Sequence, residues 1–234
     1  MTAESQIGAS KALRSSLRRG LWPLLVSILD GALVKRAFDI VFSLTVLILF
    51  SPLYLSIIFL ITLSSPGPVF YVQERIGKNY KPFGCIKFRT MVRNADEMLL
   101  QLMENSPQLR REYEGDFKLR RDPRVTFVGQ FLRITSLDEF PQFFNVLRGD
   151  MSVVGPRPVV DEEIARYGRY ADRVLSIRPG ITGLWQVSGR NDVPYPRRVQ
   201  LDLYYVNNRN LGVDLWIIIK TIGVVLFPKG NGAY

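Results

Sequence analysis

An apolar run from Phe38 to Leu63 constrains this chain more than any other feature, since few folds can use so long a run with so little polar interruption. As one straight helix its roughly 26 residues would extend about 39 Å, more than the hydrocarbon core of a bilayer requires. Ser51-Pro52 lies in the middle of the run, where proline removes a backbone donor and clashes with the carbonyl four residues earlier. The run therefore predicts two helices joined at a break.

Positive charge flanks both ends of this run. Lys35 and Arg36 precede it, and the following cations come after it: Arg75, Lys78, Lys81, Lys87 and Arg89. Basic flanks tend to stay on the cytoplasmic side, so a helix that crosses the bilayer would satisfy this tendency at only one end. We therefore favour a re-entrant helix-break-helix over a kinked span, with a soluble core helix as the third interpretation. Asp39, in the first turn, suits the positive end of the helix dipole.

Shorter apolar stretches lie near both ends of the chain. Met1 to Arg19 is rich in Ser, Ala, Lys and Arg, and the apolar patch Leu21 to Leu29 follows it. Because no A-x-A-like site follows, we expect a disordered tail and a short basic interfacial helix rather than a signal peptide. Leu211 to Phe227 is also mostly apolar, but Asp214 and Lys220 argue against a span. It is either an interfacial helix or a core helix.

The composition excludes several kinds of chemistry. The chain of 234 residues is long enough for one ordinary domain and contains no histidine and one cysteine, Cys85. Imidazole bases and ligands, Ser/His or Cys/His nucleophiles, thiolate metal clusters and intramolecular disulfides are therefore excluded, which fits a reducing cytoplasmic setting. The net charge of +10 indicates an anionic partner: nucleic acid, an anionic leaflet or a phosphorylated substrate.

The rest of the chain alternates short apolar runs with turn signals. After the breaker Ser64-Ser65-Pro66-Gly67-Pro68, two strands are predicted, at Val69 to Gln73 and Phe83 to Phe88, around the loop Gly77 to Gly84. Helices are predicted at Ala95 to Met103, Asp161 to Val174 and Pro196 to Val206, and a charged surface stretch at Asp116 to Arg124.

Adjacent carboxylates, Asp138 and Glu139, are the centre of the segment RITSLDEFPQFFNVLRGDMSVVGPRP. One interpretation is structural: Ser136 to Glu139 has the pattern of a capping box, in which Ser136 is the N-cap and Glu139 returns to its backbone N–H. The other is catalytic, because Pro141 perturbs the helix directly behind the acids and Arg133 stands just ahead of them.

Arg157 lies between two prolines that restrict its backbone. A rigid Arg beside carboxylates can bind phosphate oxygens bidentately, while a carboxylate attacks phosphorus or holds a divalent cation. Mg²⁺ is the natural metal for such oxygen ligands. The segment therefore favours phosphate chemistry.

Two further segments suit an anionic substrate. Alternation along a strand places Lys87 and Arg89 on one face, which either binds substrate or is simply solvated. Arg178 to Asn191 is dense in Gly and Pro, and Trp185 there could stack on a nucleotide base or belong to a packed turn. The sequence contains neither a G-x-x-x-x-G-K-[ST] nor a G-x-G-x-x-G motif, which disfavours P-loop and Rossmann enzymes.

Several ordered motifs resemble one known family, the bacterial polyprenyl-phosphate sugar-1-phosphate transferases. The likeness runs from about Lys35 to the C-terminus, and the chain looks like a short form without the additional N-terminal membrane helices of larger relatives. The motifs are Lys35-Arg36-Ala37-Phe38-Asp39, Ser51-Pro52, Ser65 to Phe70, Lys87 to Met91, Thr135 to Glu139, Gly149 to Pro158 and Arg178 to Gly183. The tail Lys229 to Tyr234 is similar to the exopolysaccharide galactosyl-phosphate branch.

This resemblance implies a monotopic α+β protein, mainly helical, at the cytoplasmic face of the bacterial inner membrane. Its parts would be a basic tail with an interfacial helix (residues 1–34), a re-entrant helix (35–65) and a cytoplasmic catalytic domain with a C-terminal interfacial helix (66–234). Membrane lipids would be partners and nucleic acid would not, while a homodimer stays open.

The resemblance also implies a two-step reaction. Asp138 would attack the β-phosphate of a UDP-sugar, releasing UMP and leaving a phosphosugar on its carboxylate, which undecaprenyl phosphate would then take. Glu139 would hold Mg²⁺, and Arg133 and Arg157 would bind phosphate oxygens. Further candidates for the substrate pocket are Lys87, Arg89, Arg178 and Asp202.

Two competing interpretations remain from the residues alone. A membrane-bound phosphotransferase or pyrophosphatase could use the same carboxylates without a sugar acceptor. A membrane-tethered basic binding module would explain the charge without chemistry, but its cations should then form one patch interleaved with exposed aromatics. Here Arg133, Arg157 and Arg178 sit beside acids or prolines in separate segments.

Overall fold

The computed structural model describes residues 29–116, 119 and 122–226. The structure is mainly helical with two small sheets, which confirms the predicted α+β class. The predicted basic tail up to residue 28 and the C-terminal tail from 227 lie outside the described residues.

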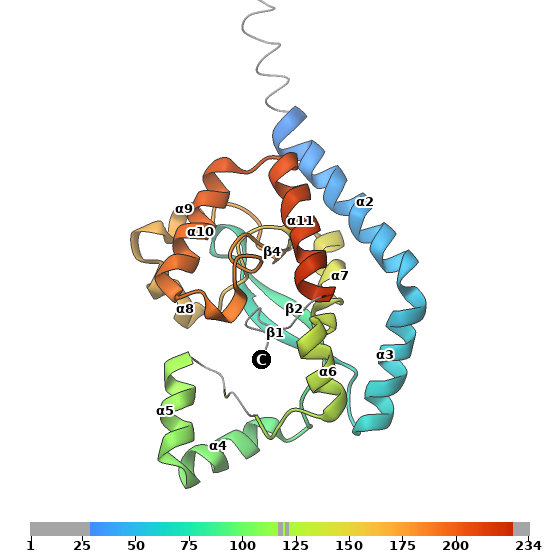
Figure 1. The fold of residues 1–234 in the computed structure, drawn as a ribbon, viewed down its shortest axis with the longest axis vertical. Helices are drawn as coiled ribbons and strands as arrows, with labels where there is room; N and C mark the ends of the chain where they lie inside the picture. The colour runs from blue at the N-terminus through green and yellow to red at the C-terminus, as the bar shows by residue number, and fades with distance from the viewer. Residues whose placement is uncertain (1–28, 117–118, 120–121, 227–234) are drawn as a thin grey trace, which may run out of the picture.

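A bent pair of helices forms one side of the molecule (Figure 1). A π-helical turn, Leu29–Leu33, leads into α2 (Val34–Leu49), and α3 (Ser51–Ser64) follows after a bend of 64°. Pro52 lies in the first turn of α3, where its missing N–H costs no helical hydrogen bond. The break predicted at Ser51-Pro52 is therefore confirmed. No described helix is by itself long and apolar enough to cross a membrane, whereas the bent pair together meets that length and composition.

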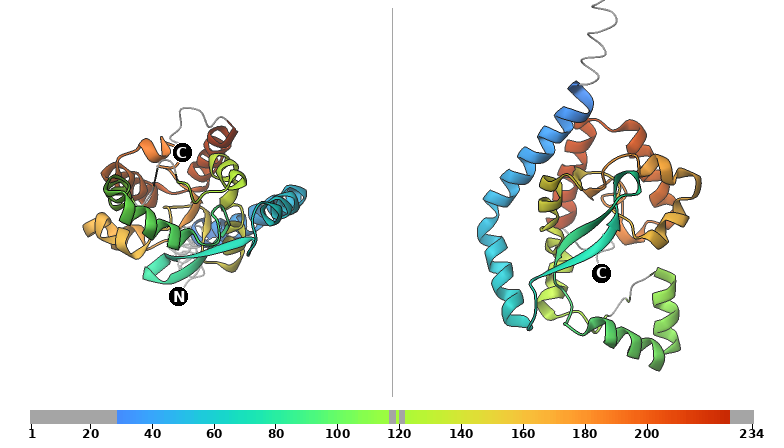
Figure 2. Two further views of the ribbon diagram at one scale, coloured as in Figure 1. Left: turned by 90° about the horizontal axis from the view of Figure 1, so that it is seen from below. Right: turned by 180° about the vertical axis from the view of Figure 1, so that it is seen from behind.

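The first sheet is an antiparallel hairpin that crosses the body of the molecule (Figure 2). Strands β1 (Phe70–Ile76) and β2 (Pro82–Phe88) pair in register, with Gln73 opposite Cys85, around a 3-10 turn at Lys78–Tyr80. Both predicted strands are confirmed, but β1 is longer than predicted, so the connecting loop is shorter than Gly77 to Gly84.

The second sheet is short and parallel. β3 (Ser152–Val154) pairs with β4 (Gly180–Thr182), and the chain around Gly155 packs directly on Gly180. A Cβ at Gly180 would collide with the backbone of Gly155, so only glycine permits this approach. The contact fixes the start of the loop that carries Arg157.

Helices make up the remainder. The longer ones are α4 (Ala95–Asn105), α5 (Pro107–Asp116), α6 (Phe127–Thr135), α7 (Gln142–Arg148), α8 (Asp161–Tyr167), α10 (Tyr195–Asn208) and α11 (Leu211–Leu226), and the shorter ones are α9 (Ala171–Val174) and the 3-10 turns Leu137–Glu139, Gly168–Tyr170 and Arg190–Asp192. Figure 1 shows α4 and α5 projecting from the body.

Two predictions about these segments were wrong. The helix predicted at Asp161 to Val174 is interrupted at Gly168, whose backbone (φ 49°, ψ −132°) is not helical. The charged stretch Asp116 to Arg124 is not wholly a surface, because Leu119 and Arg124 are buried. Arg124 is buried in an ion pair of 2.7 Å with Asp122, which removes the cost of an isolated charge.

A buried polar network joins α2 to the core. Lys35 Nζ lies 2.8 Å from Asp39 Oδ1 and 2.9 Å from Asp214 Oδ2. Asp39 also accepts hydrogen bonds from Ser152 Oγ and the N–H of Val153. It lies beyond the first turn of α2, so its role is to anchor β3 and not, as predicted, to complement a helix dipole.

Helix α11 packs one face into the core, as the core-helix interpretation predicted, and the interfacial interpretation stays a prediction. One face enters the core through Asp214, Ile217 and Ile218, while the large apolar side chains on the other face are exposed: Leu215, Trp216, Ile219, Ile222 and Leu226. The main core lies beneath this helix, where α7, α10 and both parallel strands meet.

Candidate active site

The adjacent carboxylates lie on a tight turn between two helices. Helix α6 ends at Thr135, and Ser136 adopts a left-handed backbone (φ 58°) before the 3-10 turn Leu137–Glu139. Ser136 is therefore the C-cap of α6, and the predicted capping box is wrong. An N-cap needs an extended backbone, and here the Ser136 hydroxyl instead accepts a hydrogen bond of 2.7 Å from Arg190 Nη2.

Glu139 is held by two cations from different elements. Its Oε1 lies 3.1 Å from Lys87 Nζ on β2 and 3.4 Å from Arg157 Nη1 in the loop after β3. Burial opposes ionisation of Glu139, but the charges of Lys87 and Arg157 outweigh it and lower its pKa to about 2. Glu139 is therefore anionic throughout the physiological pH range.

Asp138 has the opposite electrostatics. Burial, and after it the neighbouring charge of Glu139, raises the pKa of Asp138 to about 6, against the opposing effect of Lys87 and Arg133. Within the described part of the chain its carboxylate is not engaged in a hydrogen bond or ion pair. Adjacent acids whose pKa values are driven apart are a common signature of a catalytic site.

Arg133 and Arg157 reach this turn from different elements. Arg133 projects from α6, and its Nε donates to Thr90 Oγ1 at 3.0 Å. Burial lowers its pKa, while the charge of Asp138 raises it. Arg157 follows Pro156, whose carbonyl accepts from the N–H of Gly180. The turn is thus braced by the parallel sheet, and Arg157 is aimed at Glu139 as the sequence predicted.

Sequence reasoning missed two arginines at this site. Arg190 begins a 3-10 turn with a left-handed backbone (φ 52°). Burial lowers its pKa, whereas the charges of Glu139 and Asp138 raise it. Arg75 of β1 donates to the carbonyl of Pro158 at 3.2 Å, and burial and then the charge of Arg157 lower its pKa. Arg190 is flagged only by its Gly-rich segment, and nothing in the sequence flags Arg75.

Three predicted pocket residues are engaged elsewhere. Arg89 follows the last residue of β2 and donates to the carbonyls of Ser65 and Pro66, so it holds the end of α3. Arg178 donates to the carbonyl of Gly149 at 2.6 Å. Their role in substrate binding stays a prediction, and these contacts favour a structural one.

Asp202, the third of these residues, is completely buried on α10. Its Oδ2 accepts from Tyr167 Oη at 3.0 Å, and burial raises its pKa to about 8 although this hydrogen bond opposes the shift. Trp185 is only 6% exposed, and the Arg198 guanidinium lies 4.7 Å from its ring centroid. Of the two alternatives for Trp185, the packed turn is the one observed.

The carboxylate oxygens of Asp138 and Glu139 are too few to hold a divalent cation by themselves, and they fit one only if a substrate supplies further oxygen ligands. Among the described residues, no group of three or more Asp, Glu or Cys side chains could hold a metal ion. Both cations on Glu139 contact Oε1, which leaves Oε2 and Asp138 to face an incoming ion. Mg²⁺ commonly takes one or two protein carboxylates, with phosphate oxygens and water completing its octahedron.

Comparisons with known proteins agree on one family. A model described as bacterial sugar transferase matches residues 31–228. The undecaprenyl-phosphate galactose phosphotransferase of Salmonella typhimurium is 52% identical over 201 residues, which cover 86% of this chain and 42% of that protein. Exopolysaccharide production protein ExoY of Rhizobium meliloti is 49% identical over 201 residues, with 86% and 89% covered.

A more distant relative is the UDP-glucose:undecaprenyl-phosphate glucose-1-phosphate transferase of Escherichia coli K12, 39% identical over 211 residues. The matched part of this chain spans about two fifths of the Salmonella and Escherichia proteins and about nine tenths of ExoY.

Proposed function

This chain belongs to the bacterial sugar transferase family, and we propose that it transfers a sugar-1-phosphate from a UDP-sugar to undecaprenyl phosphate. The relatives support this acceptor, and the 52% identity to a galactose phosphotransferase supports galactose as the sugar. The similarity to ExoY supports a place at the start of exopolysaccharide assembly. The proposal rests mainly on the adjacent carboxylates of Asp138 and Glu139, whose pKa values are shifted in opposite directions and which have several cations close to them.

The first half-reaction uses Asp138 as the nucleophile. A carboxylate oxygen of Asp138 forms a bond to the β-phosphorus of the UDP-sugar, and the bond from that phosphorus to the bridging oxygen breaks. UMP leaves with the electron pair, and the phosphosugar stays on Asp138. Burial supports this role, because the buried carboxylate has a higher pKa, and so a higher basicity, than an exposed one, yet is ionised above pH 6.

The second half-reaction regenerates the carboxylate. A phosphate oxygen of undecaprenyl phosphate attacks the same phosphorus, and the bond to Asp138 breaks, giving a lipid-diphosphate sugar and the Asp138 carboxylate. No step requires a histidine, which the sequence lacks. The same turn serves both steps because each passes through a transition state with negative charge on phosphate oxygens.

The cations around the turn would bind these oxygens. Arg75 forms an ion pair of 3.7 Å with Glu163, and the other four cations, Lys87, Arg133, Arg157 and Arg190, outnumber Asp138 and Glu139, so the site keeps a positive excess that suits a diphosphate. Arg157 is held in place by its proline-bounded turn, which favours bidentate contact. Glu139, with the substrate phosphates, would hold Mg²⁺, which would supply neutralisation of the charge on the leaving phosphate.

The acceptor requires a site at a membrane surface, and the exposed apolar side chains support one. The bent pair exposes Val41, Ile48, Leu55, Phe59 and Leu63, and α6 exposes Phe127, Phe131 and Ile134 at helical spacing. Phe127 is 90% exposed, although it is a large aromatic residue. Because α6 leads directly into the turn of Asp138 and Glu139, insertion of this stripe would bring both carboxylates close to the lipid phosphates.

A burst experiment tests the proposal. Protein in nanodiscs without undecaprenyl phosphate should release about one UMP per active site from UDP-galactose, because the phosphosugar stays on Asp138. Asp138→Asn should release none, whereas Asp161→Asn, an exposed acid on α8, should behave as wild type. The lipid acceptor should then discharge the labelled sugar phosphate from the protein.

Two outcomes would contradict the proposal. UMP release that appears only with undecaprenyl phosphate would reassign Asp138 as a general base or metal ligand. Continuous release of free sugar phosphate without any lipid product would instead favour the phosphotransferase or pyrophosphatase interpretation.

A further inference from the structure

A second concave site lies on the side of the molecule formed by α8, the turn Gly168–Tyr170 and α10. The cleft holds about 880 Å³, within the range of small-ligand pockets. Successive turns of α10 line one wall, and the opposite wall comes from α8 and the turn after it. None of the residues that contact Glu139 line this cleft.

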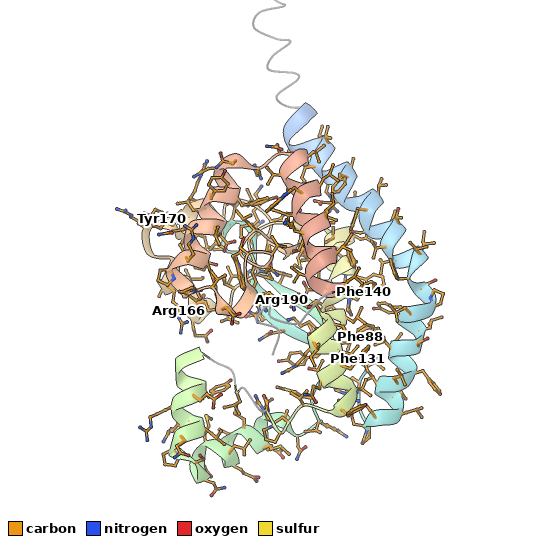
Figure 3. All side chains as sticks on the ribbon, viewed as in Figure 1. Phe88, Phe131, Phe140, Arg166, Tyr170 and Arg190 are labelled. Carbon is orange, nitrogen blue, oxygen red and sulfur yellow. The ribbon has the colours of Figure 1, made fainter. Side chains whose placement is uncertain are left out.

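The lining of the cleft combines positive charge with aromatic rings. Arg166 and Arg169 are exposed on it, and none of the described residues that line it is acidic. The Arg166 guanidinium lies 5.0 Å from the Tyr195 ring centroid, and that of Arg169 lies 4.9 Å from the Tyr170 centroid. Figure 3 shows Arg166 and Tyr170 on the same side of the body. Stacking on a ring orders each guanidinium, so less side-chain entropy is lost when an anion binds.

The tyrosines provide surfaces for a ring. Tyr204 is 59% exposed on the α10 wall, and Gln200 and Asn207 lie one turn to either side of it. Tyr167 forms the buried floor, where its hydroxyl donates to Asp202. A cleft that is lined by an exposed aromatic ring, two amides and two stacked guanidinia suits a ligand that has both a ring and an anionic group.

We propose that this cleft, the Tyr–Arg cleft, binds a small phosphorylated ligand that carries a ring, either a nucleotide or a sugar phosphate. The phosphate would lie against Arg166 and Arg169, whose two charges match a dianion. The ring would lie on Tyr204. The site is separate from the catalytic turn and does not depend on the function proposed above.

The test is a calorimetric titration of the full-length chain in detergent, with UMP, galactose-1-phosphate and inorganic phosphate as three separate ligands. Since the catalytic turn also attracts phosphates, the titration is made on the variant Arg157→Gln as well, which weakens that site. Arg157→Gln should keep one site per chain, and addition of Arg166→Gln with Arg169→Gln should abolish it. The matched control, Arg111→Gln with Arg148→Gln, removes the same charge from exposed positions outside the cleft and should not change binding.

The variant Tyr204→Ala distinguishes a nucleotide ligand from a sugar phosphate ligand. If a base stacks on this ring, UMP affinity should fall by about tenfold, the size of one stacking contact, while phosphate affinity stays constant. If the sugar is the ring, galactose-1-phosphate should be the one affected.

The inference is overturned if Arg157→Gln alone abolishes all phosphate binding. It is also overturned if the Arg111/Arg148 control lowers affinity as much as the cleft variant, or if Tyr204→Ala affects neither organic phosphate.

Discussion

At the scale of single residues, Asp138 and Glu139 show how environment divides two neighbouring carboxylates. Both are desolvated, but Glu139 contacts Lys87 and Arg157 directly, and these cations favour its ionised form. Ionisation of Asp138 is instead opposed by burial and by the charge of Glu139. The pair is therefore one permanent anion and one group that titrates close to neutral pH. This division suits the proposed role of Asp138 as a nucleophile beside an anionic Glu139.

The pH dependence of the UMP burst follows from this division. Because only ionised Asp138 attacks, the burst rate should fall as pH decreases through about 6, and Glu139 should add no inflection until about pH 2. Lys87→Met removes a cation that favours ionisation, so its acid limb should move to higher pH. Stopped-flow measurement of the burst between about pH 3.5 and 8 checks this, and an acid limb near pH 4 would contradict it.

Asp202 should govern stability instead of catalysis. Its folded-state pKa, about 8, lies above the unfolded value near 4, so the native state retains a proton that the unfolded state loses. Its contribution is fully present below pH 4 and is lost as pH rises toward 8. Between pH 5 and pH 8.5 the melting temperature of the wild type should therefore fall more than that of Asp202→Asn. The variant should stay active. Equal pH dependence of the two proteins would argue against the buried proton.

At the scale of elements, the site depends on how closely α6 packs on the end of β2. Gly129 allows this approach, since a Cβ there would overlap the backbone of Thr90. The same Thr90 accepts from Arg133 through its hydroxyl, and from the N–H of Thr126 through its carbonyl. Helix α6, which precedes the turn of Asp138 and Glu139, is thus positioned by backbone contact.

Gly129→Ala should be destabilising for this reason. Overpacking at such a contact costs about 1–3 kcal/mol, and moving α6 should also lower the burst rate by displacing Arg133. Gly223→Ala is the control, because its Cβ would meet no atom within 4 Å and alanine favours a helix by up to about 1 kcal/mol. Unfolding in detergent followed by tryptophan fluorescence compares the two. Equal stability would show that α6 can shift freely.

At the scale of the whole molecule, the bent pair and the core form one unit through Lys35. This lysine joins Asp39 of α2 to Asp214 of α11, and Asp214 Oδ1 accepts from Tyr205 Oη. Arg36 donates to the carbonyls of Val146 and Leu147 at the end of α7. The bent pair is therefore tied to α7, which follows the turn of Asp138 and Glu139, and its orientation in a membrane would set the orientation of that turn.

Topology is the prediction at this scale. Leu33→Cys and Lys78→Cys place exposed thiols on the two basic flanks, and the native Cys85 is buried and should give little background. If the pair is re-entrant, an impermeant maleimide should label both sites only after the inner membrane is opened. Labelling of either thiol from the periplasmic side would show a span. Pro52→Ala removes the break and should favour such a span.

Features that depend on neighbours in the chain could be predicted from the sequence. Pro52 indicated the break between α2 and α3, and two short apolar runs indicated the hairpin. Asp138, Glu139 and Arg157 were named as candidates from their motifs alone, and their chemical roles stay a prediction. Local backbone preferences and residue types act over a few positions, so they can be read from the chain.

Contacts between residues that are distant in the sequence became visible only in the folded molecule. Arg190 donates a hydrogen bond to Ser136, where a capping box was predicted. Arg89 donates to the carbonyl of Pro66 at the end of α3, and Asp202 is buried. The separation of the two acidic pKa values likewise needs Lys87, which lies 52 residues from Glu139. Desolvation and Coulomb interactions depend on distances in space and not on separation along the chain. The pKa shifts of Asp138 and Glu139 could therefore not be predicted from a sequence pattern.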